Sequence, residues 1–145
     1  MKWDDTKSVE ESARERLPLL FAKFYAAGRE VIEHEDAATL HQFRLRGKRV
    51  RYTLELFRPV YGPGLDQLLK GLRRAQTSLG EINDCATAHD LVGDPQFHDW
   101  IAARQAALRD AFRKYWLDEF DAPGREQHWV RYLRTYARRK QNPRQ

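Results

Sequence analysis

The 145-residue sequence contains a single cysteine, Cys85. One thiol excludes an intramolecular disulfide and a zinc site built on several thiolates. No segment approaches about 18 consecutive apolar residues, and the first residues lack the apolar core of a signal peptide, so we expect a soluble, cytoplasmic protein that does not enter the membrane. The sequence also lacks a glycine-rich phosphate loop and a nucleophile-elbow motif.

Alternating strand patterns of useful length and internal repeats are missing as well, and apolar residues instead recur at helical spacing. Turn signals at 61–64, 93–95 and 121–124 divide the chain. We expect helices over residues of about 8–34, 37–60, 65–92, 95–116 and 128–139. Short connections between long amphipathic helices predict an all-α fold, an antiparallel four-helix bundle with an extra short C-terminal helix. The length fits a single domain, residues 1–145.

Positive charge is unevenly distributed along the chain, whose net charge is only +5. Residues 36–58 carry six basic and two acidic side chains, and residues 125–145 carry seven and one. The remaining segments are slightly acidic. Two basic blocks on an otherwise acidic protein indicate a localised anion site more than a diffuse basic coat.

The first basic block reads as one amphipathic helix. An apolar side is formed by residues at i, i+4, i+7, i+11 and i+14: Phe43, Gly47, Val50, Leu54 and Phe57. A neighbouring stripe carries His41, Arg44, Lys48 and Arg51, a row about 15 Å long at ~1.5 Å rise per residue. Like charges in a row are costly unless an anion neutralises them.

Two motifs on consecutive helices extend this pattern. They read His41-x-x-Arg44-x-x-x-Lys48-Arg49-x-Arg51-Tyr52-x-x-Glu55-Leu56-Phe57 and Leu72-x-x-x-Gln76-x-x-Leu79-Gly80-x-x-Asn83-Asp84. With both motifs the sequence resembles the CHAD family, the conserved-histidine α-helical domains. The resemblance covers residues of about 40–92, and the motif core lies within 36–92.

The resemblance implies a helical bundle that binds inorganic polyphosphate, and family members are often found on polyphosphate granules. We expect no cofactor and no bound metal. Family members are typically two similar four-helix halves related by a pseudo-twofold. This chain has room for one half, which looks more like the second. A second copy would supply the missing half, so we expect a homodimer.

Arg44, Lys48 and Arg51 are the central candidates for phosphate contacts, because arginine offers a planar fork and lysine a point charge to phosphate oxygens. His41 heads the row, either as a donor that strengthens on protonation or as a histidine bonded to Asn83 or Asp84. Arg49 is included among the phosphate-binding candidates because it belongs to the family motif. The next helix would add a second wall to the phosphate-binding site if its orientation places three further cations on the same side as the row: Lys70, Arg73 and Arg74.

Other motif residues are interpreted as structural. We expect Tyr52 to be a packing residue with its hydroxyl bonded, and Glu55 to fix Arg51 or Arg58. Gly80, inside a helix, suggests close helix packing. The alternative for the whole stripe is a solvated helix face whose charges are paired with neighbouring acids.

Catalysis has only weak support. His89-Asp90 is a dipeptide found in metal phosphohydrolases, but the further metal ligands of such an enzyme cannot be placed in the sequence. Residues 33–36 are candidates for a divalent-metal site, but four consecutive side chains at a helix end point in different directions. His41 and Glu55 lie roughly 21 Å apart along one helix, too far for direct coupling. We therefore expect a non-catalytic polyphosphate binder. Nucleic acid is the main alternative ligand, although few side chains of the stripe suit base reading. The block 125–145 either extends the anion track or only solubilises the terminus.

Overall fold

A computed structural model describes residues 6–34 and 36–138 of the chain. These residues form helices and connecting turns, with no strand among them. In chain order the elements are α1 (Val9–Glu33), α2 (Ala37–Leu56), α3 (Arg58–Tyr61), the 3₁₀ turn η1 (Pro63–Leu65), α4 (Asp66–Leu91), α5 (Pro95–Tyr115), the π-helical turn η2 (Trp116–Phe120) and α6 (Arg125–Thr135).

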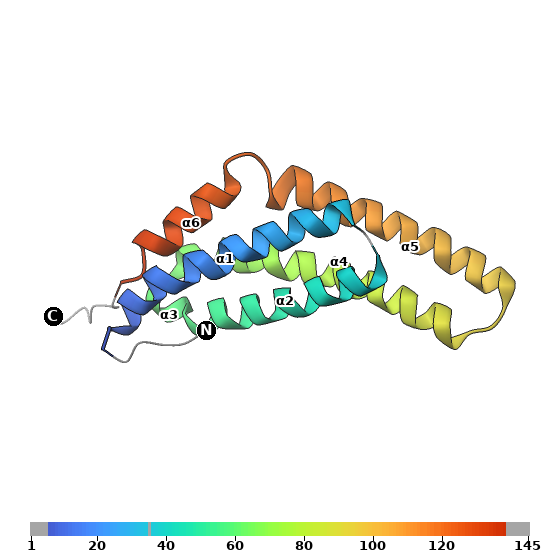
Figure 1. Ribbon diagram of the computed structural model, residues 1–145, viewed down its shortest axis with the longest axis horizontal. Coiled ribbons are helices and arrows are strands. Elements are labelled where there is room, and N and C mark those ends of the chain that lie inside the picture. Colours follow the sequence, from blue (N-terminus) through green and yellow to red (C-terminus); the bar gives the residue numbers. More distant parts are fainter. Residues whose placement is uncertain (1–5, 35, 139–145) are drawn as a thin grey trace.

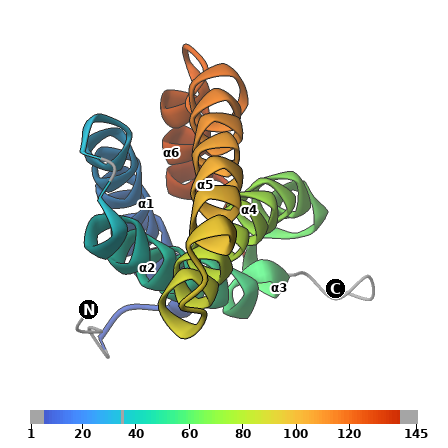
Figure 2. The ribbon, with the colours of Figure 1, turned by 90° about the vertical axis from the view of Figure 1, so that its right-hand side faces the viewer.

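The long helices lie side by side along the long axis of the molecule, with alternating direction (Figure 1). Helix α2 packs on α1 and on α4, α5 packs on α4, and α6 packs on α1. Together α5, η2 and α6 form the fourth side of the bundle as one broken helix, which is also seen end-on in Figure 2. The predicted all-α antiparallel bundle is therefore confirmed, and the short C-terminal helix shares this fourth side with α5. The hairpin of α4 and α5 projects beyond the ends of α1 and α2.

Local sequence signals explain most helix boundaries. Helix α2 starts after Asp36, whose carboxylate caps the helix by accepting a hydrogen bond of 2.8 Å from the backbone N–H of Thr39. Helix α2 ends at Leu56, earlier than expected, because Pro59 has no N–H to continue the helical bonding pattern. Pro18 lies inside a continuous α1.

The last helix was placed too far along the chain by the sequence pattern. Helix α6 spans Arg125–Thr135, whereas helix was expected from His128 to Arg139, and residues 139–145 lie outside the described part. Gly124, with φ of 85°, allows the chain to turn directly into α6 after the break at Pro123. The expected helix missed this earlier start.

Aromatic side chains fill the centre of the bundle. Trp116 is fully buried, and its ring contacts those of Phe24 and Phe43, which stack on each other with centroids 4.8 Å apart. A Cβ atom on Gly28 would overlap the Trp116 indole, so only glycine fits at this position of α1. The cluster joins α1, α2 and η2 and holds α2 in a fixed rotation.

Buried tyrosines tie the C-terminal elements to the rest of the bundle. The Tyr25 hydroxyl donates to the Phe120 carbonyl at 2.8 Å, and the Tyr61 hydroxyl donates to the Leu133 carbonyl at 2.7 Å. Burial raises the pKa of both Tyr25 and Tyr61 well above the usual range. These bonds fix η2 and α6 against the N-terminal helices.

Candidate functional site

The antiparallel packing of α2 on α4 brings the two sequence motifs together. His41 and Asn83 line the same small cavity, and Arg44 Nε lies 3.9 Å from the position of a Cβ on Gly80. Farther along, Glu55 of α2 contacts Arg73 of α4. We call this side of the molecule the basic surface and define it by five side chains: His41, Arg44, Lys48, Arg51 and Arg73.

Two cations of the basic surface have no neutralising partner among the residues that the structure describes. Arg44 and Lys48 are half-buried against the bundle. Within residues 6–34 and 36–138, neither has a carboxylate within 4.0 Å. The alternative of a solvated face with paired charges does not describe these two positions, where positive charge is left available to an external anion.

One carboxylate neutralises the other end of the surface. Glu55 Oε1 accepts from Arg51 Nη1 and from Arg73 Nη2, at 3.1 Å in each case. The expectation that Glu55 fixes Arg51 is thus confirmed, while Arg58 pairs instead with Asp66 at 2.8 Å. Glu55 therefore bridges α2 and α4 and competes with any external anion for both arginines.

Two buried hydrogen-bond donors at this interface have no acceptor. They are Arg51 Nε and Gln76 Nε2, judged over the residues that the structure describes. Gln76 Nε2 lies 3.7 Å from the Cβ position of Gly47, so it sits between α2 and α4. Buried donors are nearly always paired in folded proteins, and an unpaired one costs free energy. Gln76 belongs to the second motif, but its spacing within that motif does not distinguish this role from packing.

The remaining predicted candidates lie elsewhere. Arg49 lines a groove of about 320 Å³ between α1 and α2, together with Arg46 and Glu30. Lys70 and Arg74 line a cavity of about 280 Å³ on the other side of α4. Five of the eight predicted residues therefore share the basic surface, and three do not: Arg49, Lys70 and Arg74.

Arg74 has partners of its own on that other side of α4. Its guanidinium pairs with Glu119 at 3.0 Å and lies 4.2 Å from the centre of the Tyr115 ring. Of the expected second wall on α4, only Arg73 faces α2.

Two structural expectations about the motifs were wrong. Tyr52 does not pack in the core: it is 55% exposed, and the Arg51 guanidinium lies 4.7 Å from its ring centre. Gly80 does not serve close backbone packing, because a Cβ there would meet only Arg44 Nε, at an ordinary contact distance. The contact shows that the Arg44 side chain lies across α4 at this position.

His41 is exposed at the start of the row. No hydrogen bond joins it to Asn83 or Asp84 among the described residues, although it shares a cavity with Asn83. In the C-terminal block, Trp129 is buried while Arg131 is exposed, and α6 packs on α1. The arginines of α6 therefore do not continue the row on α2.

Groups considered for metal or acid–base chemistry are dispersed. His89 contacts Asp90 at 3.4 Å and stacks on His98, far along the α4–α5 hairpin. In the acidic run 33–36, Glu35 lies outside the described residues. No cluster of three or more His, Cys, Asp or Glu side chains suited to a metal ion occurs in the described ranges. Within the same ranges, no helix has the length and apolar character required to cross a membrane.

Comparison with known proteins gives one clear result. The sequence model of the CHAD domain matches residues 3–93, which include α1 to α4 and leave α5 onward unmatched. The match contains both motifs and extends to the first helix. No curated protein and no solved structure matches significantly. CHAD domains are in general associated with polyphosphate. Because the match spans more than half of the sequence, the chain belongs to the CHAD domain family.

Proposed function

We propose that the chain binds inorganic polyphosphate on the basic surface and does so without catalysis. The observation that carries the proposal is the pair of unneutralised cations, Arg44 and Lys48, on the family motif. Phosphate oxygens are negatively charged and accept hydrogen bonds, so they suit the half-buried side chains of Arg44 and Lys48.

The spacing favours a linear polyanion over a single phosphate. His41 and Arg51 are ten residues apart on one helix, which separates their backbones by about 15 Å at ~1.5 Å per residue. One phosphate group cannot contact both ends of such a row. A chain with a negative charge on every unit can contact His41, Arg44, Lys48 and Arg51 in sequence.

Rigid support of the row is part of the proposal. The apolar side of α2 is held by the aromatic core, because Phe43 stacks on Phe24 and contacts Trp116. The helix that carries the cations therefore does not have to be ordered by the ligand, which lowers the entropic cost of binding. A stoichiometric binder of this kind is suited to attaching to polyphosphate granules in the cytoplasm or to organising stored polyphosphate.

Single-stranded nucleic acid is a second candidate ligand. It is favoured by Tyr52, whose exposed ring lies next to the basic surface and is available for stacking on a base. Cationic rows do not by themselves distinguish phosphate polymers. The two candidates therefore differ in whether Tyr52 contributes to binding.

A competition titration separates these candidates. In this titration, long-chain polyphosphate is set against single-stranded and duplex DNA at matched phosphate concentration and about 0.15 M salt. The proposal predicts strong preference for polyphosphate and unchanged polyphosphate affinity in Tyr52→Ala. Equal binding of DNA, with a large loss of affinity in Tyr52→Ala, would make nucleic acid the ligand instead.

A further inference from the structure

The end of the α4–α5 hairpin exposes large apolar side chains. We call residues 89–100 the tip. Leu91 is 79% exposed, Trp100 is 60% exposed and Val92 is 39% exposed. The tip projects past the ends of α1 and α2, and no other helix among residues 6–34 and 36–138 covers it (Figure 1). Exposed apolar side chains gathered in one place mark interaction surfaces.

The same region is acidic. Between residues 75 and 103 the sequence has no lysine or arginine. This stretch has five acidic residues, of which three belong to the tip: Asp90, Asp94 and Asp99. A surface of this kind repels phosphate polymers, and it attracts a partner that is apolar and positively charged.

Internal bonds hold the tip in shape. A His98 ring nitrogen bonds the Val92 carbonyl, and the His98 ring stacks on that of His89 with centroids 4.1 Å apart. The Asp94 carboxylate caps α5 by accepting from Gln96 N–H at 2.8 Å. Leu91 and Val92 are therefore presented by an ordered turn, which lowers the entropic cost of docking.

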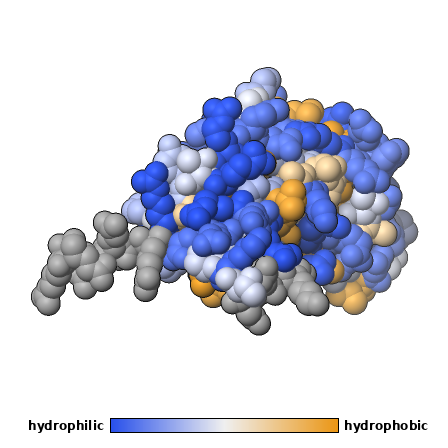
Figure 3. Space-filling model, turned by 60° about the vertical axis from the view of Figure 1, so that its left-hand side comes forward, coloured by the Kyte–Doolittle hydropathy of each residue, from blue (hydrophilic) through white to orange (hydrophobic). Residues whose placement is uncertain are grey.

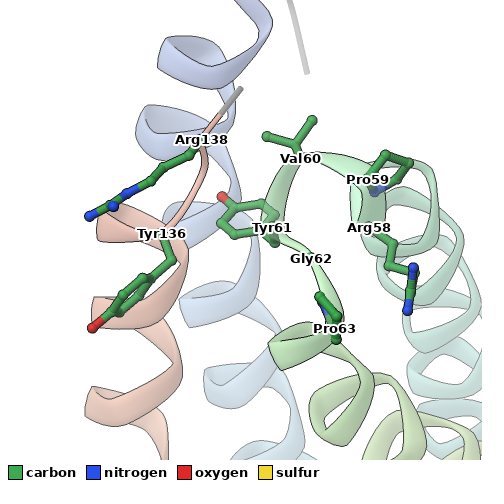
Figure 4. Close-up of a pocket in the computed structure, with 8 residues that line it drawn as sticks. All are labelled: Arg58, Pro59, Val60, Tyr61, Gly62, Pro63, Tyr136 and Arg138. Carbon is green, nitrogen blue, oxygen red and sulfur yellow. The ribbon is translucent and has the colours of Figure 1, made fainter. Parts of the chain in front are cut away.

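A groove with complementary properties lies at the opposite end of the molecule. It has a volume of about 580 Å³ and runs between α3 and the segment after α6 (Figure 4). Its lining is mainly apolar or aromatic, with an arginine on either side: Arg58, Pro59, Val60, Tyr61, Gly62, Pro63, Tyr136 and Arg138. From this end the molecule is largely hydrophilic, with a few small apolar patches (Figure 3).

The two arginines of the groove differ in their pairing. Arg58 forms a two-point ion pair with Asp66, with distances of 2.8 and 3.0 Å. Arg138 has no carboxylate partner in the described part of the chain and lies over the Tyr136 ring at 5.9 Å. Its charge is therefore available to a docked acidic group.

We propose that the tip of one copy docks into this groove on a second copy. The contact buries Leu91 and Val92 against the apolar groove walls and places the acids of the tip beside Arg138. A single contact thus covers the unpartnered apolar surface and pairs the unpaired cation. Because tip and groove lie at opposite ends, the contact is heterologous and generates open head-to-tail chains.

This mode differs from the homodimer expected of a half-length CHAD domain. A closed twofold dimer would use a single self-complementary patch. The outer side of α2, where Leu56 is 76% exposed, is the candidate surface for such a dimer. The two modes therefore assign self-association to different leucines, Leu91 and Leu56. The head-to-tail contact does not depend on the ligand of the basic surface.

Sedimentation velocity over a range of protein and salt concentrations tests the proposal on the full chain. We expect association that continues beyond the dimer and weakens with salt. A tip variant, Leu91→Gln with Trp100→Gln, and a groove variant, Tyr136→Gln with Arg138→Glu, should each weaken it by about tenfold or more. The matched control is Leu56→Gln, with an equally exposed leucine, which should associate like the unmodified chain. Circular dichroism checks that every variant is folded.

Mixing the two variants gives the sharpest test. The tip variant keeps an intact groove and the groove variant keeps an intact tip, so an equimolar mixture should form dimers that grow no further. A dimer lost in Leu56→Gln but unchanged in both other variants would overturn the proposal in favour of the α2 face. A chain that stays monomeric throughout would also overturn it.

Discussion

Replacing Glu55 by glutamine should strengthen polyphosphate binding. Glu55 is the carboxylate that holds both Arg51 and Arg73, each at 3.1 Å. A phosphate that binds these arginines has to displace Glu55 or share them with it. Glutamine keeps the shape and one hydrogen-bond acceptor of glutamate but removes the negative charge.

The size of the effect follows from the geometry. A bound phosphate on Arg51 lies on the order of 5 Å from the Glu55 carboxylate, where two like charges repel by about 1 kcal/mol in a water-like dielectric. Removing the repulsion should tighten binding about fivefold. The salt dependence should steepen by about one released counterion, because more cationic charge is free for the ligand.

Stability should change little in this variant. The ion pairs of Glu55 are partly exposed, with side-chain exposures of 20% for Arg51, 30% for Glu55 and 56% for Arg73. Partly exposed ion pairs of this kind contribute about 1 kcal/mol or less to the free energy of unfolding. The free energy of unfolding in urea should therefore fall by no more than about 1 kcal/mol.

The assay is a fluorescence or calorimetric titration with long-chain polyphosphate at several salt concentrations. Glu119→Gln is the matched control, because Glu119 pairs with Arg74 at 3.0 Å on the other side of α4. It removes the same charge away from the basic surface and should leave affinity nearly unchanged. If Glu55→Gln weakened binding instead, Glu55 would be positioning the arginines for the ligand, and the competition described above would be refuted.

Two further predictions concern the bundle that supports the surface. Gly28→Ala places a Cβ against the buried Trp116 indole and should lower the free energy of unfolding by about 1–3 kcal/mol, measured by urea denaturation; unchanged stability would contradict the close contact. Tyr25→Phe should cost about 1 kcal/mol at pH 8, because the hydroxyl bonds the Phe120 carbonyl. Burial raises the pKa of Tyr25 in the folded chain, so the stability it contributes is present below about pH 10 and is lost as the pH rises beyond it. Denaturation at pH 8 and at about pH 10.5 should show a smaller alkaline loss in Tyr25→Phe than in the unmodified chain, and an equal loss would contradict the assignment.

Helical periodicity and capping signals were sufficient to predict most of the bundle. Asp36 marks the start of α2, and the apolar spacing from Leu65 predicts α4 almost to its end. What the pattern does not contain is the π-helical turn η2, which bends the fourth side so that Trp116 and Phe120 enter the core. That turn depends on contacts with α1, which no local pattern encodes.

The candidate site was predictable where a single helix determines it. Arg44, Lys48 and Arg51 share one stripe because of their spacing on α2, whatever the rest of the fold does. The contribution of α4 depends on its rotation about its own axis, and there Arg73 faces α2 whereas Arg74 faces α5 and η2. Adjacent residues on a helix point about 100° apart, so the motif alone did not decide between them.

The most direct test of the central claim compares two sides of α2 at equal change in charge. Arg44→Gln with Lys48→Gln removes the two unpaired cations of the basic surface, and Arg46→Gln with Arg49→Gln removes two cations that line the groove toward α1. Polyphosphate titration of both variants, with circular dichroism as the check on folding, should show affinity reduced by about tenfold or more in the first and by only a few-fold in the second. Equal losses in the two variants would mean that net charge alone attracts the ligand, and would contradict a specific site between α2 and α4.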